Sequence, residues 1–468
     1  MKEMIFRNKV ILLFTVLCLV CTFIADTSVS YIASEVFARV GRNTCLVLAL
    51  IIPCLAGLGM NFGIVVGAMA AQIAIFWVVH WGFDGIEGFL LCALISTPIA
   101  IFFGWLVGLL YNKTKGSEMI AGLVLGFFAD GLYRLFVLYI IGGVIPFEDP
   151  NLLDRGFGLR NAFDLTGNLK YALDDISFLT VLMLLGVLSI LSALIMAIHG
   201  KKTGNPVEKK ETLKKLIIGV VLLVFGIIAK FVPMLNLLFG SKRLILTDAA
   251  LFGGIGLIVY AVIRFITKRP QVGEKYFFKL IFIAIGGVLL AAGTVFAPVR
   301  AVYQAIQLPA CTYAVICVFC YINKWIMSTR LGQNMRTVGQ NRAVATAAGI
   351  DVDKTRIIAT CISTVLAAWG QLIFLQNLGT FNTVQQQTNV GLYSVAAILV
   401  GGATIQKANN KQAVMGVILF HTLFVVAPLA ATKIVGDSAV SEYIRMFISY
   451  GVIAVSLALY AWKSVKKN

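Results

Sequence analysis

The chain has 468 residues, of which 59% are hydrophobic and 13% are charged, and its mean hydropathy is +0.92. A soluble domain has about 25% charged residues, so this composition excludes an ordinary soluble protein. The formal net charge of +18 would suggest nucleic acid as the partner of a soluble protein. In a membrane protein positive charge first reports topology, and no nucleic-acid partner is expected.

Apolar runs recur from Val10 to Trp462, and a bilayer core about 30 Å thick requires roughly 20 apolar residues per helix. The sequence therefore predicts an all-α polytopic membrane protein with about 14 transmembrane helices. No small-residue cleavage site follows the first run, which is therefore interpreted as an uncleaved span. The expected spans are 10–28, 45–60, 62–80, 87–110, 118–144, 177–199, 215–236, 248–267, 278–298, 309–328, 355–379, 387–404, 411–431 and 443–463.

The charged residues between spans predict the topology. Residues 201–215 hold six lysines, whereas residues 146–176 hold six acids and three basic residues. Positive loops stay in the cytoplasm, so we expect both termini and the basic loops 201–215, 268–279 and 324–356 there. The acidic loop is expected outside.

Cysteine and histidine indicate no metal or redox chemistry. The nine cysteines lie mostly inside apolar runs, including the pair Cys317 and Cys320, and free cysteine is commonly a packing residue. The three histidines are far apart in sequence. No metal site is expected.

Two segments interrupt the apolar pattern. Residues 45–79 are too long for one helix and contain Gly57, Gly59, Asn61 and Gly63, which indicates a break or a re-entrant turn. This makes Asn61 a candidate pathway residue; the alternative is a short loop between two spans.

The second segment, Leu375 to Asn389, is polar and uncharged. Its amides suit a neutral, hydroxyl-rich solute, so Gln376, Asn377 and Asn382 are further pathway candidates. The alternative is an ordinary outer loop.

Asp130 and Arg134 lie four residues apart in a predicted span and therefore share one helix face. Ionisable groups at membrane depth are costly unless they are paired or face a cavity. Two interpretations remain: a structural intrahelical ion pair, or groups that line the pathway. Gly122 and Gly126 of the same span form a GxxxG pattern that permits close helix packing.

The chain has no GxxxxGK[ST] phosphate loop, no GxGxxG after a strand and no HExxH. We therefore expect no cofactor on this chain and no enzymatic activity; if transport uses ATP, a partner subunit binds it.

The segment from Thr329 to Arg356 is basic, with glycine breaks at Gly339 and Gly349 around a short helix-prone piece, Arg342 to Ala348. A short helix against the membrane suits docking of a soluble partner; the alternative is a plain basic loop.

This segment resembles the cytoplasmic loop of ABC importer permeases of the branched-chain amino acid, ribose and nucleoside type. The resemblance implies that residues from about Gly339 to Ile350 form the coupling helix, which fits a groove on the ATP-binding subunit. The matching residues to which it assigns this coupling role are Val338, Gly339, Asn341, Ala345, Ala348, Gly349 and Ile350.

Residues 392–402 are similar to a second segment of that family, and Gly416 follows at the expected distance. Upstream, Glu118, Ile120 and Leu125 match the family's Asn-Glu-x-Ile motif, strongest in the nucleoside branch, and add Glu118 to the pathway candidates. Ser117 and two glycines depart from this motif.

The resemblance implies a permease core in two parts, 1–199 and 310–468, with an insertion of about four spans at 200–309. It implies a subunit of an importer in the bacterial inner membrane for a small polar solute, a nucleoside or simple sugar being favoured. The implied partners are ATPase subunits, a second permease in a homodimer or heterodimer, and an extracytoplasmic solute-binding protein. The alternatives are a branched-chain amino acid importer, a secondary transporter, a membrane-embedded enzyme and a scaffold or receptor.

Overall fold

The computed structural model divides into two compact units, which are described separately. Unit 1 comprises residues 1–28, 35–173 and 312–468, and unit 2 comprises residues 29–34 and 174–311. The structure describes residues 9–145, 152–153, 156–203, 206–233, 235–236, 244–268, 275–404, 407–437, 439–440, 442–448, 450–451 and 454.

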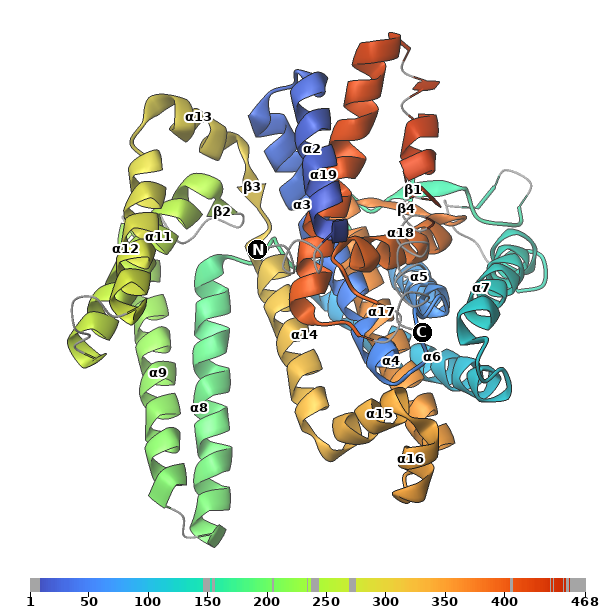
Figure 1. Cartoon of the computed structure of the whole chain (residues 1–468), viewed down its shortest axis with the longest axis horizontal. Coiled ribbons are helices and arrows are strands. Elements are labelled where there is room, and N and C mark those ends of the chain that lie inside the picture. Colours follow the sequence, from blue (N-terminus) through green and yellow to red (C-terminus); the bar gives the residue numbers. More distant parts are fainter. Residues whose placement is uncertain are drawn as a thin grey trace. The chain divides into compact units, whose positions relative to one another are not determined.

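The described part of unit 1 is helical apart from one small sheet, β1 (Ala162–Asp164) with β4 (Thr380–Asn382) (Figure 1). Helix α3 starts in unit 2 and continues into unit 1, and α14 likewise begins at the boundary. The helices are α2 (Lys9–Ala25), α3 (Val29–Leu48), α4 (Ile51–Leu55), α5 (Ile64–His80), α6 (Gly85–Lys113), α7 (Glu118–Leu135) with the π-helix η1 (Phe136–Ile140), α14 (Ala310–Ser328), α15 (Arg330–Gln340), α16 (Arg342–Ala347), α17 (Val352–Leu378), α18 (Gln386–Val400) and α19 (Asn410–Val435).

Helix α17 lies in the core of unit 1 and packs against α5 and α6. Glycine permits these close contacts: a Cβ on Gly67 of α5 would lie 2.5 Å from the Thr364 carbonyl oxygen, and one on Gly108 of α6 would lie 2.9 Å from Ile357 Cα. Helix α5 is buried along nearly its whole length and carries no charged residue between Ile64 and Val79. An all-round apolar helix of this kind belongs in a core.

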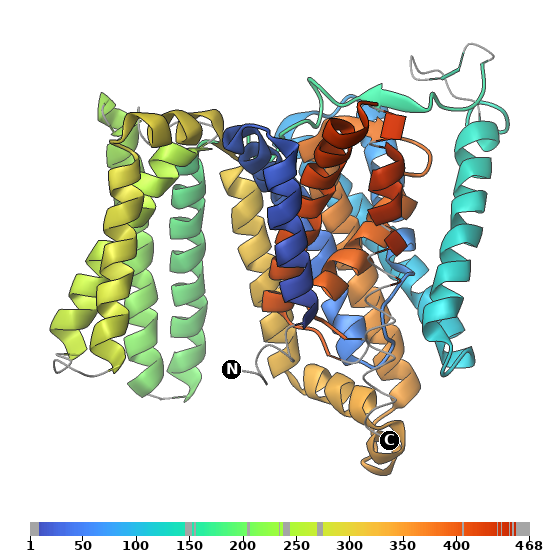
Figure 2. The ribbon, with the colours of Figure 1, turned by 45° about the horizontal axis from the view of Figure 1, so that its top comes forward.

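Helix α17 also connects the two ends of unit 1 (Figure 2). Its 27 residues correspond to a length of about 40 Å. One end, here called the α16 end, carries α15 and α16. The other, the sheet end, carries β1 and β4, where Phe163 pairs with Phe381.

Asp164 Oδ1 accepts hydrogen bonds from Thr166 N and Oγ1, which lowers the pKa of that carboxyl group.

Unit 2 consists mainly of two helical hairpins, α8 with α9 and α11 with α12. Each hairpin closes on a glycine pair: Gly186 faces Gly219, and Gly254 faces Gly287. The second pair follows the first by 68 residues in both helices, so the two hairpins are built alike. The elements are α8 (Phe178–Thr203), α9 (Pro206–Phe231), β2 (Leu244–Ile245), α11 (Leu246–Lys268), α12 (Lys275–Gly293), α13 (Ala297–Ala305) and β3 (Gln307–Leu308), with β2 paired to β3.

The prediction of an all-α polytopic membrane protein is confirmed. Among the described residues, ten helices are long and apolar enough to cross a membrane, and two shorter apolar helices cover 10–25 and 64–80. The predicted break at residues 57–63 is also confirmed, because α4 ends at Leu55 and α5 begins at Ile64. Most of the predicted span 443–463 lies outside the described residues.

The predicted start of the second span at Cys45 is wrong, since α3 already begins at Val29. The predicted span excluded residues 35–42 because they include charged side chains, but in the structure these side chains have partners. Glu35 pairs with Arg39 at 3.2 Å, and the Arg39 guanidinium lies 5.4 Å from the centre of the Phe424 ring. Paired in this way, charges are tolerated in a buried helix.

We expect Gly416→Ala to destabilise the fold. Its Cβ would meet the Ala397 carbonyl oxygen and lie 2.8 Å from Gly401 N, where α18 and α19 cross. Overpacking of this kind costs about 1–3 kcal/mol. Thermal unfolding of the purified protein in detergent, followed by tryptophan fluorescence, should show a lower midpoint.

The matched control is Gly131→Ala in α7, where an added Cβ meets nothing within 4 Å. Alanine stabilises a helix relative to glycine by up to about 1 kcal/mol, so the unfolding midpoint of this variant should not fall. Equal midpoints for the two variants would contradict this description of the α18–α19 crossing.

Candidate functional site

The segment that resembles a coupling loop forms two short helices at the α16 end. Thr329 caps α15, its Oγ1 accepting a hydrogen bond from Gly332 N at 3.3 Å. Asn341 caps α16, its Oδ1 accepting from Ala343 N at 2.9 Å and Val344 N at 3.2 Å. Asparagine is among the best residues for this position.

The predicted break at Gly339 is wrong. Gly339 lies inside α15, and the chain turns at Asn341, whose extended backbone (φ −157°) separates the two helices. The capping side chain of Asn341 satisfies amides at the start of α16, so a break forms there without glycine.

Helix α16 ends at Ala347, and the break predicted at Gly349 is present. Gly349 has φ +76°; its N–H donates to the Thr346 carbonyl at 3.0 Å, and Ile350 N–H donates to the Ala345 carbonyl at 3.0 Å. This pair of bonds is a Schellman motif, in which the left-handed residue is usually glycine. The motif fixes the direction in which the chain leaves α16.

The residues assigned to coupling face two ways. Val338 and Ala345 are buried, whereas Asn341, Ala348 and Gly349 are exposed. Val344, which was not predicted, exposes 56% of its surface. The α16 end therefore presents a short helix with an apolar side chain on its outer face.

Gly339 joins α15 to the interruption between α4 and α5. A Cβ on Gly57 would lie 2.7 Å from Gly339 Cα, and one on Gly339 would lie 2.9 Å from Gly57 N. The two backbones are therefore in direct contact, which only paired glycines allow. A displacement of α15 toward the segment 56–63 would press on it.

Glu118, the first residue of α7, binds two arginines from this region. Its Oε1 accepts a hydrogen bond from Arg342 at 2.6 Å and from Arg356 at 2.5 Å. Arg356 is fully buried and also donates a hydrogen bond to the Tyr111 carbonyl oxygen at 3.1 Å. Arg342 Nη2 lies 3.5 Å from the Gly57 carbonyl oxygen. This cluster, here called the Glu118 cluster, connects α7, α16, α17 and the interruption. Sequence reasoning found Glu118 through the family motif but missed both arginines, since no spacing connects them.

Asn61 lies in the same interruption and is buried. Tyr111 Oη donates to Asn61 Oδ1 at 2.7 Å, and Asn61 Nδ2 donates to Ser363 Oγ at 3.3 Å. Of the predicted GxxxG pair, Gly122 makes a close contact beside it, because a Cβ on Gly122 would collide with Tyr111 Oη, whereas a Cβ on Gly126 would lie no nearer than 3.7 Å to any neighbour.

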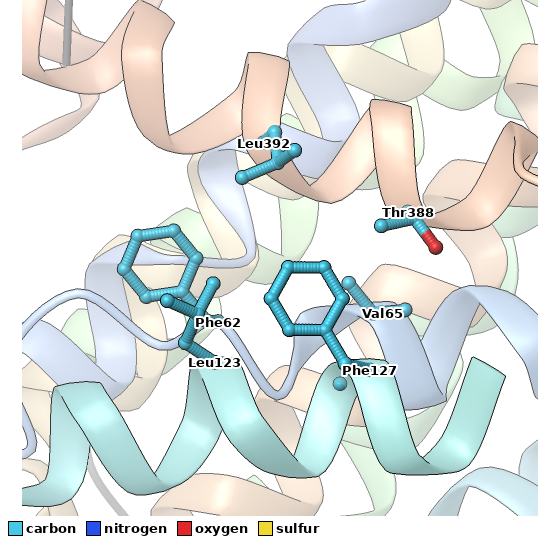
Figure 3. A pocket seen from close by; sticks show the side chains of 7 residues that line it. Phe62, Val65, Leu123, Phe127, Thr388 and Leu392 are labelled. Atoms are coloured by element: carbon cyan, nitrogen blue, oxygen red, sulfur yellow. The ribbon is translucent and has the colours of Figure 1, made fainter. Parts of the chain in front are cut away.

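A narrow, mainly apolar cleft lies beside Phe62, the residue that follows Asn61, between α5, α7 and α18. Figure 3 shows the rings of Phe62 and Phe127 directed into it, with Thr388 on the α18 side. Its lining residues are Phe62, Val65, Leu123, Gly126, Phe127, Thr388 and Leu392. Sequence reasoning named none of them as site residues, because isolated apolar residues in a span carry no distinguishing pattern.

Asp130 lies one turn beyond Gly126 on α7. Its Oδ2 pairs with Arg134 Nη2 at 2.7 Å, so the intrahelical ion pair is present. Its Oδ1 accepts a hydrogen bond from Gln387 Nε2 of α18 at 2.6 Å. The carboxylate therefore also joins two helices beside the cleft.

The other predicted pathway residues lie at the sheet end. Gln376 is buried, and it and Asn377 donate to Thr312 Oγ1 at 3.1 and 3.0 Å. Asn382 lies in β4, and its N–H donates to Gln386 Oε1 at 3.0 Å. The predicted set is thus divided among the Glu118 cluster, the cleft and the sheet end.

We expect Glu118→Gln to destabilise the fold strongly. It removes the only carboxylate that pairs with Arg356 in the described part of the chain, and breaking a buried pair from one side costs about 3–5 kcal/mol. The unfolding midpoint of the purified protein should fall accordingly.

The exposed pair of Lys115 and Asp353, 2.8 Å apart and about half accessible on each side, provides the comparison. Asp353→Asn should cost at most about 1 kcal/mol. A Glu118→Gln variant as stable as Asp353→Asn would show that Arg356 does not depend on Glu118.

Comparison with known proteins places these elements in a family. The family model described as "Branched-chain amino acid transport system / permease component" matches residues 177–457, more than half of the chain, and its limits include residues 200–309. The xylose transport system permease protein XylH of Haemophilus influenzae is 30% identical over 118 residues, which are 25% of this chain and 30% of the relative. The matched part is thus less than a third of that relative's length. No solved structure matches the chain. The chain belongs to the family of branched-chain amino acid transport system permease components, which are ABC importer permeases.

Proposed function

We propose that this chain is a permease subunit of an ATP-binding cassette importer that moves a small polar solute across the bacterial inner membrane. Separate ATPase subunits power alternating access, a second permease completes the pathway as a homodimer or heterodimer, and an extracytoplasmic binding protein delivers the solute. The contact of the α15–α16 loop with the interruption at 56–63, through Gly57 and Gly339, carries this proposal.

The contact matters because movement of α16 has a direct route inward. An ATPase that displaces α16 pulls on Arg342 and hence on Glu118 at the start of α7. It also pushes Gly339 against the interruption that holds Asn61 and Phe62. Packed elements with two discrete arrangements transmit motion in this way.

The charge distribution supports an orientation with the α16 end and both termini in the cytoplasm. Basic loops stay on the cytoplasmic side, and the α15–α16 segment has basic residues on both flanks. The acidic loop 146–176 then faces outward as the docking surface for the binding protein. Part of this loop, 146–151 and 154–155, lies outside the described residues.

A nucleoside or simple sugar is the proposed solute. The relative XylH is named for xylose transport, and the amides near the sheet end suit hydroxyl groups. The family model is named for branched-chain amino acid transport, which remains the alternative. In the proposed pathway the solute passes the sheet end at Gln376, Asn377 and Asn382, then Asp130 and Arg134, and finally Asn61 and Glu118.

A secondary transporter is the other alternative. It requires an intramembrane carboxylate that exchanges ions with the solute pathway. Asp130 is bound by Arg134 and by Gln387, which disfavours this role.

The proposed domain organisation keeps a core in two parts, 1–199 and 310–468, with inserted spans at 200–309. Unit 2 runs over 174–311 apart from a short piece of α3, which supports a separate structural role for the inserted spans.

We expect Gly349→Val to abolish ATP-driven uptake while the complex still assembles. A β-branched residue at φ +76° costs about 1–2 kcal/mol and redirects α16. Gly349→Asn should retain more uptake, because asparagine tolerates the left-handed region. Uptake of labelled uridine and D-xylose into proteoliposomes with the ATPase partner measures this.

The control is Gly436→Val, which places the same strain (φ +80°) at the end of α19. It should leave uptake intact relative to the amount of complex. Full uptake by Gly349→Val, or ion-driven uptake with no ATPase present, would refute the importer proposal.

A further inference from the structure

The two hairpins of unit 2 expose mainly apolar side chains. In each of α8, α9, α11 and α12, only 17% of the most apolar stretch of 18 residues is buried within the chain. Apolar helices of this length with exposed surfaces belong in lipid. A charged side chain among them therefore needs an opposite charge or has to reach the polar edge of the bilayer.

Lys215 of α9 is such a charge in the first hairpin. Its Nζ donates to Ser192 Oγ at 3.2 Å and to Met196 Sδ at 3.1 Å, both on α8, and its carbonyl oxygen accepts from Ser189 Oγ at 2.8 Å. The ammonium group is thus held between the two helices by neutral atoms. No carboxylate pairs with it among the described residues. An ammonium group has three donors, so one remains for another molecule.

Arg264 of α11 is the corresponding charge in the second hairpin. Its guanidinium carbon lies 5.5 Å from the centre of the Tyr260 ring. In the part of the chain that the structure describes, it makes no hydrogen bond and no ion pair. A contact with a ring face leaves the five N–H donors of the guanidinium group available.

The two cations lie at the same level of their hairpins. Because the glycine pairs of the hairpins are 68 residues apart, Met196 of the first hairpin corresponds to Arg264 of the second. Lys215 reaches across from α9 to Met196, the position at which the second hairpin has its arginine. The counterpart of Lys215 is Ile283, so a hairpin of this design closes without a lysine there. Each hairpin therefore supplies one cation at this level, but from a different helix.

The surroundings of both cations favour an occupant with a negative head and an apolar body. Residues 201–215 hold six lysines and two acids, and residues 264–279 hold five basic residues and one acid. Exposed apolar side chains flank each cation: Leu213 (57%) and Leu216 (37%) near Lys215, and Ile263 (56%) and Phe265 (49%) on either side of Arg264. Basic residues at the end of membrane-spanning helices attract anionic phospholipids.

We propose that unit 2 binds anionic phospholipid, with one headgroup phosphate at Lys215 and another at Arg264. Phosphate oxygens accept the N–H donors that these side chains have left. The acyl chains lie along the exposed apolar surfaces of α8 and α9, and of α11 and α12. The inserted spans then have a role of their own, which does not depend on the importer function.

Native mass spectrometry of the full-length chain in a neutral detergent tests this, with phospholipid as the titrant. The probes are phosphatidylglycerol, phosphatidylcholine and inorganic phosphate. We expect phosphatidylglycerol to bind more tightly than phosphatidylcholine, which has the same phosphate group but no net charge. Inorganic phosphate at millimolar concentration should not displace the lipid, since it lacks the apolar contacts. Equal binding of the two lipids, or displacement by phosphate, would overturn the proposal.

The variants are Lys215→Ile and Arg264→Met. Each introduces the residue that the other hairpin has at the equivalent position, Ile283 or Met196, so both should fold. Loss of one charge should raise the apparent dissociation constant for phosphatidylglycerol about fivefold and leave that for phosphatidylcholine unchanged. Lys215→Arg, which keeps the charge, should bind more phosphatidylglycerol than Lys215→Ile.

The matched control is Lys230→Gln, which removes the same charge from the same helix. Lys230 is exposed and lies 15 residues after Lys215, or about 22 Å along α9. This variant should bind phosphatidylglycerol as the natural chain does. An equal loss in Lys230→Gln and Lys215→Ile would mean that net charge alone attracts the lipid, which contradicts a site at Lys215.

A protein partner with acidic side chains is the other possible occupant, and co-purification with the ATPase and the second permease separates the two. The hairpin variants should still assemble with these subunits. Lost assembly together with unchanged binding of phosphatidylglycerol would assign both cations to a protein contact and overturn the proposal.

Discussion

The Glu118 cluster is the interaction on which the geometry of the α16 end depends. Arg356 is fully buried near the start of the longest buried helix of unit 1, and an uncompensated charge there is strongly unfavourable. One carboxylate oxygen receives both arginines. Because the partners come from α7, α16 and α17, the positions of these helices are constrained by one short set of charge-assisted bonds, the strongest class of side-chain hydrogen bond.

Close backbone contacts supply the second constraint. Gly57 against Gly339, and Gly67 against Thr364, leave no room for side chains, so the elements they join cannot slide independently. The interruption at 56–63 is held between these contacts. Its one polar side chain, that of Asn61, has its partners in α6 and α17. The segment is therefore irregular in backbone but fixed in position, as membrane interiors require of non-helical chain.

The sequence predicted what local pattern encodes: the apolar spans, the interruption after Leu55, the Asp130–Arg134 pair and the glycine that ends α16. The sequence-based prediction was wrong or incomplete where contacts between residues far apart in the sequence determine the structure. Helix α3 includes the charged residues 35–42, where Arg39 contacts Glu35 and the Phe424 ring, and the turn at Asn341 has a side-chain cap. The cleft of Phe62, Phe127 and Thr388 joins three helices far apart in sequence, so no single stretch of sequence indicated it.

The paired hairpins of unit 2 have a consequence for how such a chain can grow. Each hairpin consists of an outgoing and a returning helix, and its glycine contact joins these two helices of the same hairpin. Adding or losing one such unit therefore leaves every later helix pointing in its original direction. In the proposed orientation, a chain of this family can vary in length at this position without turning α16 away from the proposed ATPase subunits.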